Sequence, residues 1–286
     1  MLTSIFTLVA LSFILATLLI FADIKWRINE NPLYDDVELM LPQVNCGACG
    51  YPGCRAFAEA LVDKKALPGL CSVSSTQTHK DIAQRLGVDV GSQEKNVARL
   101  ACAGGNNVAK HHANYIGLKN CRAASLVSGG SKNCAWGCLG LGDCAKVCQF
   151  NAIIISENHL PVVNEDKCTG CNDCVDICPK DLFSLHLQSH RLWVACKNLE
   201  NGDELLNSCE VACTACGRCA LDAPDNTITM QNNLPVIDYT LYQKTLEPIK
   251  RCPTGAIVWL AEDGNILKGP DAAPIVRHSD KELDCS

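Results

Sequence analysis

Cysteine is the residue type in this sequence that could do chemistry. Of the 286 residues, 21 are cysteine, which is several times the usual share. Most stand two or three residues apart in tight runs, of which the clearest is Cys168, Cys171, Cys174 and Cys178. Such spacing lets several thiolates reach one small inorganic cluster, whereas disulfide frameworks seldom show it. We therefore expect iron–sulfur clusters that carry single electrons.

A glycine-rich segment near the N-terminus holds the first candidate set of ligands. Cys46, Cys49 and Cys54 lie within it, a helix is expected over residues 55–65, and Cys71 follows that helix. The glycines let the backbone come close to a bulky cluster. Four thiolates could also bind structural zinc, but the C-x2-C-x4-C spacing lacks the paired C-x2-C knuckles usual for zinc. The sequence thus predicts a small four-cysteine [4Fe–4S] domain over residues 37–75.

An internal repeat occupies the second half of the chain. In each copy, cysteine runs flank two short β-branched segments separated by a polar turn, at residues 151–163 and again at 226–237. This pattern predicts a β-hairpin between two loop-and-helix units. It is the plan of a bacterial ferredoxin, in which a C-x2-C-x2-C-x3-C-P run gives three ligands to one cluster and its fourth cysteine to the other. We expect a two-cluster domain over 121–186, the first copy, and a degenerate one-cluster domain over 193–268, the second copy.

The ferredoxin plan divides the cysteines of the first copy between two clusters. One [4Fe–4S] cluster is expected on Cys148, Cys168, Cys171 and Cys174. The expected ligands of its partner are Cys134, Cys138, Cys144 and Cys178. The earlier run is looser than the pattern, with three and five residues between its first three cysteines, but its number of cysteines is kept.

The second copy keeps one complete set of ligands. The expected members are Cys213, Cys216, Cys219 and Cys252. Cys209 could replace Cys216, although the tighter C-x2-C-x2-C spacing favours Cys216. Aligning the copies puts other residues where the second cluster would have its ligands, namely Tyr242, Thr245, Pro248 and Ala223. We therefore expect four clusters in the chain, or about 16 irons at four per cluster.

Apart from the alternative ligand Cys209, four cysteines remain outside these sets: Cys102, Cys121, Cys196 and Cys285. Cys196 lies 75 residues after Cys121, so the repeat reaches back at least that far. Neither these two nor Cys102 has a partner at chelate spacing, and free cysteine is among the most buried residue types. We expect these three to be small buried hydrophobes, with a further thiolate site as the alternative.

The N-terminus predicts a membrane anchor over residues 1–24. Residues 2–22 carry no charge, and a helix needs about 20 apolar residues to cross the hydrocarbon core. The chain lacks the basic start of a cleaved signal peptide. Lys25 and Arg27 follow the apolar stretch, so the positive-inside rule places the cysteine-rich body in the cytoplasm. That compartment keeps thiols reduced and favours metal ligation.

Charge and composition exclude other classes of function. The net charge of −6 offers no broad basic surface for nucleic acid, and only 5% of residues are aromatic, so base-stacking platforms are not expected. The sequence has no dinucleotide-binding glycine motif, P-loop or nucleophile elbow. Residues 76–120 are expected to connect the domains and residues 269–286 to form a flexible tail. The predicted fold class is α+β, with an anchor helix, the four-cysteine domain and two ferredoxin-like units.

The string from Leu41 to Cys54, followed by Cys71, resembles the iron–sulfur domain found in the B subunit of the Rnf complex and in its Rsx relatives. The order of anchor helix, four-cysteine domain and two-cluster ferredoxin domain over residues 1–178 follows that family, and the second copy resembles its longer members. The resemblance carries over the four cysteines from Cys46 to Cys71 and the eight from Cys134 to Cys178. Gln149 departs from the family by replacing a proline that donates nothing to iron.

The resemblance implies an electron-transfer subunit of an inner-membrane complex that couples electron transfer between ferredoxin and NAD to ion translocation. The implied partners are soluble ferredoxin as donor and membrane-embedded and peripheral sister subunits. Two alternatives stand beside it. The chain could be the iron–sulfur subunit of another membrane dehydrogenase, or a zinc-binding scaffold anchored at the membrane.

Overall fold

The computed structural model describes residues 2–26, 31–92 and 94–275, which form two compact units. Unit 1 comprises Met1–Asn45, Tyr51–Pro68 and Ser74–Val90. Unit 2 comprises Cys46–Gly50, Gly69–Val73 and Gly91–Ser286. The predicted four-cysteine domain is therefore shared, because two of its loops count with unit 2.

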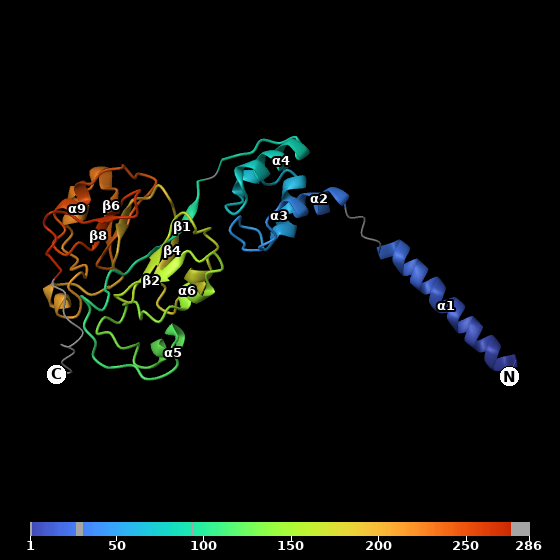
Figure 1. Cartoon of the computed structure of the whole chain (residues 1–286), viewed down its shortest axis with the longest axis horizontal. Coiled ribbons are helices and arrows are strands. Elements are labelled where there is room, and N and C mark those ends of the chain that lie inside the picture. The colour runs from blue at the N-terminus through green and yellow to red at the C-terminus, as the bar shows by residue number, and fades with distance from the viewer. Residues whose placement is uncertain (1, 27–30, 93, 276–286) are drawn as a thin grey trace. The chain divides into compact units, whose positions relative to one another are not determined.

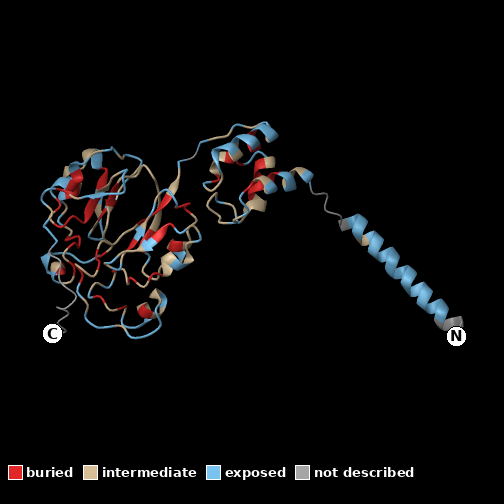
Figure 2. Cartoon of the chain, in the orientation of Figure 1, coloured by how far each residue is buried: buried red, intermediate tan, exposed pale blue. Residues whose placement is uncertain are grey.

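The first helix of unit 1, α1 (Leu2–Trp26), is apolar along its length. Its large apolar side chains from Ile5 to Ile24 are exposed, and Figure 2 shows most of the helix in the colour of exposed residues. The segment Ile5–Lys25 is long and apolar enough to cross a membrane. These properties fit a single-pass membrane anchor. Lys25 lies at the end of this span, whereas Arg27 lies outside the described residues.

The rest of unit 1 is a small helical body made of α2 (Pro32–Met40), α3 (Cys54–Val62) and α4 (Thr76–Leu86). Its core consists of the fully buried side chains Val37, Phe57, Leu61 and Ile82. The Ser75 hydroxyl accepts the Thr78 N–H at 3.1 Å and caps α4, which satisfies a donor that the helix leaves free. Gly87 adopts a left-handed conformation and ends α4.

Unit 2 contains the two predicted hairpins. In the first copy, β2 (Ile153–Ile155) pairs with β3 (Pro161–Val163), and in the second, β6 (Ile228–Gln231) pairs with β7 (Leu234–Ile237). Both pairs are antiparallel and lie in separate sheets, as Figure 1 shows. The ferredoxin-like plan predicted from the repeat is thus confirmed at the level of the hairpins.

Each copy also has an outer antiparallel pair that closes it. In the first copy, β1 (Asn96–Leu100) pairs with β4 (Phe183–Leu187). In the second, β5 (Leu192–Val194) pairs with β8 (Ile257–Leu260), which also pairs with β9 (Ile266–Leu267). Strand β1 therefore belongs to the sheet of the first copy, although residues 76–120 were expected to connect the domains. Its side chains Val97 and Ala98 are buried in the core of that copy.

Short helices carry the cysteine runs. They are α5 (Cys121–Leu126), α6 (Asp143–Val147), α7 (Asp173–Asp176), α8 (Arg218–Asp222) and α9 (Glu247–Lys250), with 3-10 turns at η1 (Pro68–Leu70), η2 (Asp203–Asn207) and η3 (Pro224–Asn226). Gly142 and Gly217 precede α6 and α8 with positive φ angles of 81° and 71°. Glycine is favoured there because the chain must reverse between successive cysteines without a Cβ clash.

The end of the described chain differs from the prediction of a flexible tail. The Ala273 N–H donates to the Pro253 carbonyl at 2.9 Å, and Gly269 packs so closely on α9 that an added Cβ would stand 1.9 Å from the Ile249 oxygen. Residues 269–275 therefore pack onto the second copy. The remainder of the predicted tail, with Cys285, lies outside the described residues.

Candidate iron–sulfur sites

The first site lies beside the β2–β3 hairpin and collects the four cysteines that the ferredoxin plan grouped. Cys148, Cys168, Cys171 and Cys174 line one pocket of about 320 Å³, including space open to solvent. Its walls are apolar, with Ala98, Ile153 and Leu185 among them. The Ala98 N–H donates to the Cys168 sulfur and the Ala152 N–H to the Cys148 sulfur, each at 3.4 Å. N–H groups aimed at sulfur stabilise a thiolate and tune a bound cluster.

The second site differs from the prediction in one cysteine. The pocket of about 410 Å³ is lined by Cys121, Cys138, Cys144 and Cys178, and Cys134 is not part of it. Leu141 occupies the place of the middle cysteine in the expected C-x2-C-x2-C run. Cys121 comes from α5 instead, because the Asp143 carboxylate accepts the Cys121 N–H at 2.7 Å and holds the start of α5 beside Cys144. The structure therefore brings Cys121 to this pocket in the place predicted for Cys134.

Three thiols of these two sites are weak acids in the metal-free protein. Burial, and after it the neighbouring cysteines, raises the pKa of Cys138, Cys144 and Cys174 to about 12. The metal-free thiols are therefore protonated at neutral pH. A metal must displace those protons, which couples binding to proton release.

The third site lies in the second copy. Cys213, Cys219 and Cys252 share one core with Leu192, Ile228 and Ile257. Cys216 is exposed, yet its thiol raises the pKa of both Cys213 and Cys219, after the larger effect of burial. The alternative ligand Cys209 packs in a different cluster with Val108, Leu205 and Val211. The structure thus places Cys216, and not Cys209, with this set.

Residues other than cysteine stand where the aligned second copy would carry the ligands of a second cluster. Tyr242 and Ala223 pack against the core, and Pro248 is fully buried. The Tyr242 hydroxyl accepts the Leu192 N–H at 3.2 Å. The position is filled by packing and hydrogen bonding, and the single cluster expected for this copy stays a prediction.

The N-terminal cysteines lie on segments that belong to both units. Cys46, Cys49 and Cys71 are on the two loops that count with unit 2, whereas Cys54 begins α3 in unit 1. The Asn45 side chain accepts the Cys54 N–H at 2.8 Å, and a Cβ on Gly53 would stand 3.0 Å from that same oxygen. Glycine at this position therefore leaves room for the Asn45 side chain that orients Cys54. The grouping of these four cysteines stays a prediction.

Within the described residues, no three cysteine, histidine or carboxylate side chains meet as closely as one metal ion needs. A zinc ion holds its sulfurs about 2.3 Å from a single point. The four thiolates of a cubane instead bind four separate irons and surround a larger body. The cysteine-lined pockets provide space for such a body.

Two segments match known families of iron–sulfur domain. Residues 41–73 match the family described as "Putative Fe-S cluster", and residues 135–185 match "4Fe-4S dicluster domain". The second match begins after Cys134 and contains the seven cysteines from Cys138 to Cys178.

Similar proteins cover most of the chain. The B subunit of the Na(+)-translocating ferredoxin:NAD(+) oxidoreductase complex of Acetobacterium woodii is 36% identical over 88% of this chain and 74% of its own length. The B subunit of an ion-translocating oxidoreductase complex of Methanosarcina acetivorans is 35% identical over 90% of this chain and 97% of its own length. The B subunit of the proton-translocating ferredoxin:NAD(+) oxidoreductase complex of Clostridium ljungdahlii is 36% identical over 90% of this chain and 91% of its own length.

Proposed function

We propose, from the premise that this chain belongs to the family of B subunits of ion-translocating oxidoreductase complexes, that it relays electrons from reduced ferredoxin to sister subunits of a membrane complex. The observation that carries the proposal is that unit 2 contains separate pockets each lined by four cysteines. The complex as a whole couples electron transfer between ferredoxin and NAD to ion movement. This chain performs no bond chemistry on a substrate.

Each cluster site is assigned four thiolates from this chain. The proposed ligand sets are Cys46, Cys49, Cys54 and Cys71; Cys121, Cys138, Cys144 and Cys178; Cys148, Cys168, Cys171 and Cys174; and Cys213, Cys216, Cys219 and Cys252. A [4Fe–4S] cluster supplies reversible one-electron chemistry when bound. The protein residues bind it, exclude water with apolar walls and aim backbone N–H groups at sulfur, all of which tune its reduction potential.

The anchor and its flanking charges support a cytoplasmic body. Lys25 follows the apolar span, and Arg27 follows it in the sequence, so the positive-inside rule places residues 31–275 on the cytoplasmic side, where ferredoxin is found. No charged residue lies between Ile5 and Ala22, and a single uncharged helix offers no path for an ion. The ion therefore moves through other subunits.

Native membranes provide the experiment. The full-length chain, purified anaerobically with its partners, is mixed with reduced ferredoxin while visible absorption is followed. We expect bleaching of a broad iron–sulfur absorption at a rate that depends on ferredoxin concentration, and co-purification of an NAD-reactive subunit. Co-purification with a different dehydrogenase, and no bleaching by ferredoxin, would contradict the proposal.

A further inference from the structure

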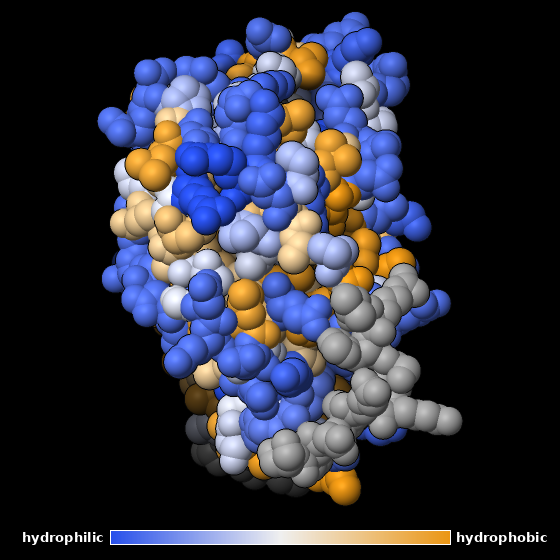
Figure 3. Space-filling view, turned by 90° about the vertical axis from the view of Figure 1, so that its left-hand side faces the viewer, coloured by the Kyte–Doolittle hydropathy of each residue, from blue (hydrophilic) through white to orange (hydrophobic). Residues whose placement is uncertain are grey.

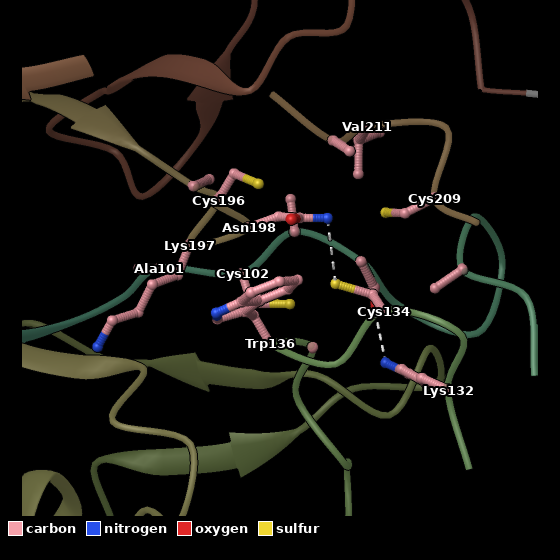
Figure 4. A pocket seen from close by; sticks show the side chains of 16 residues that line it. Ala101, Cys102, Lys132, Cys134, Trp136, Cys196, Lys197, Asn198, Cys209 and Val211 are labelled. Atoms are coloured by element: carbon pink, nitrogen blue, oxygen red, sulfur yellow. Dashed lines mark hydrogen bonds between the residues drawn. The ribbon is translucent and has the colours of Figure 1, made fainter. Parts of the chain in front are cut away.

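A third cysteine-lined pocket lies in unit 2, outside every set assigned above. It is lined by Cys102, Cys134, Cys196 and Cys209, with about 380 Å³ of space that includes some open to solvent. Figure 4 shows the four sulfur atoms turned toward the space between them. We propose that these four cysteines bind a further [4Fe–4S] cluster, an inference that rests on the proposed iron–sulfur relay.

Four segments far apart in sequence build this pocket. Cys102 follows β1 by two residues, and Cys196 follows β5 by two residues. The Ala103 N–H donates to the Ala195 carbonyl at 2.9 Å, which brings these two segments together. Cys209 is held by an isolated β-bridge to Ala109. Convergence of cysteines from equivalent strands of the two copies is not expected of incidental buried thiols.

The pocket walls leave room that a larger residue would fill. A Cβ on Gly104 would stand 3.1 Å from the Cys209 sulfur and 3.7 Å from the Cys102 sulfur. Trp136 closes one side of the pocket. Small residues line much of the remainder, namely Ala101, Ala103, Ala109, Gly137, Ala195 and Ala212. Such a lining suits a compact body larger than a water molecule, held by sulfur.

A buried cation and a buried amide also face the pocket. Lys132 is only 4% exposed and Asn198 only 2% exposed. The Lys132 ammonium donates to the Gly104 carbonyl at 2.5 Å, and no ion pair with a carboxylate accompanies it within the described part of the chain. The Asn198 amide donates to the Cys134 sulfur at 3.8 Å. A buried charge needs a compensating partner, and a cluster with four thiolates supplies net negative charge.

The repeat explains why these cysteines are free for another site. Leu141 of the first copy corresponds to Cys216 of the second, 75 residues later, and Cys121 lies 75 residues before Cys196. In the first copy Cys121 completes the set that lacks a middle cysteine. In the second copy Cys216 is present, so Cys196 is not needed there. All 20 cysteines of the described chain then fall into five sets of four.

Hydrogen bonds place this pocket between two of the other sites. The Cys138 N–H donates to the Cys102 sulfur, and the Cys213 N–H donates to the Cys196 sulfur, each at 3.4 Å. Cys138 belongs to a set in the first copy and Cys213 to the set in the second. A cluster here connects the two copies: one electron that leaves a reduced neighbour is taken up by this cluster and then passed on, and no proton or bond is exchanged.

Iron counting on full-length chain purified anaerobically in detergent tests the site. We expect about 20 irons per chain at four per cluster, and a loss of about four in the double variant Cys102→Ser/Cys196→Ser. Serine retains an oxygen that can accept the two N–H bonds but is a poor ligand for iron. Neither cysteine is a ligand in any other set, so a loss reports this site.

Two control variants make the iron count interpretable. Cys285→Ser should keep every iron, and Cys213→Ser/Cys219→Ser should lose about four from its own set. A wild-type count near 16, or a Cys102→Ser/Cys196→Ser chain that keeps its full count, would overturn this site and leave the relay intact. A colourless, iron-free wild type would overturn the relay as well.

A second variant tests the site without removing a ligand. Lys132→Met should keep all the iron and shift one cluster's midpoint potential to a more negative value, because a buried positive charge stabilises the reduced cluster. Electron paramagnetic resonance during a redox titration measures the shift. Unchanged potentials for every cluster would contradict the placement of a cluster beside Lys132.

Discussion

In the first copy, the space beside the β2–β3 hairpin is a pocket lined by four cysteines, whereas beside β6–β7 the corresponding positions carry Tyr242, Thr245, Pro248 and Ala223. Both hairpins pair in antiparallel register, and each copy is closed by an outer strand pair. The backbone plan is thus common to both copies. The side chains at one cluster position differ between the copies.

In the second copy, aromatic side chains pack around this position. Tyr239 stacks on His190 with ring centroids 3.9 Å apart and meets Tyr242 edge-on at 5.7 Å. The Tyr239 hydroxyl donates to the Leu192 carbonyl at 2.9 Å, while the Tyr242 hydroxyl accepts the N–H of the same residue. Two tyrosines thereby hold the start of β5. The comparison indicates that side chains in the second copy fill the volume that cysteines line in the first.

The face seen in Figure 3 is mostly hydrophilic, with scattered apolar patches. Buried residues gather around the strands of both copies in Figure 2. The cysteines are part of those cores, so a cluster that is lost leaves an interior gap.

Iron removal should produce the largest difference in hydrogen exchange between the two copies. When a chelator strips the full-length chain anaerobically, we expect amide hydrogen exchange to rise more across residues 144–178, which line two pockets, than across residues 234–249, where side chains fill the space. Mass spectrometry of exchanged peptides measures this. Equal increases in the two segments would mean that the aromatic packing does not substitute for a cluster.

Removing the aromatic filling should loosen only the second copy. Tyr242→Ala deletes a half-buried ring and should lower the free energy of opening at β5 by about 2 kcal/mol. Tyr242→Phe loses one hydrogen bond and should lower the same free energy by about 1 kcal/mol. Native-state hydrogen exchange at residues 192–194 measures both. The neighbouring exposed Leu241→Ala is the matched control and should change it by less than about 0.5 kcal/mol. A Tyr242→Ala chain indistinguishable from that control would refute the packing role.

Restoring a single cysteine should have the smallest effect. Ala223→Cys returns one of four ligands to the second copy, and one thiolate cannot hold a cubane. Iron per chain should equal that of Ala223→Ser, measured side by side. A gain of about four irons would show that other side chains complete the site.

The sequence predicted what depends on local spacing. The two hairpins, the helices and the set around Cys168 follow from patterns within about 30 residues of one another. The exchange of Cys134 for Cys121 depends on a long-range contact, the Asp143 carboxylate at the start of α5, which spacing does not encode. Leu141 in place of a middle cysteine was the available signal.

The pocket around Cys134 was missed for the same reason. Cys102 and Cys196 have no partner at chelate spacing, whereas Cys134 and Cys209 are each separated by three residues from a neighbouring cysteine run and were read with it. The four line one pocket in which the segments after β1 and β5 lie side by side. The 75-residue offset between Cys121 and Cys196 indicated the repeat but not the ligand each copy needs. Tertiary convergence therefore decides ligation wherever a run is loosened.

The central claim is that sets of four cysteines in this chain hold iron–sulfur clusters. The most direct test measures iron, acid-labile sulfide and zinc in the anaerobically purified full-length chain. The account predicts a brown protein with equal amounts of iron and sulfide, about 16 of each from the four sets of the proposed relay and about four more from the pocket between the copies, with zinc well below one per chain. A colourless protein carrying several zinc ions and no sulfide would contradict it.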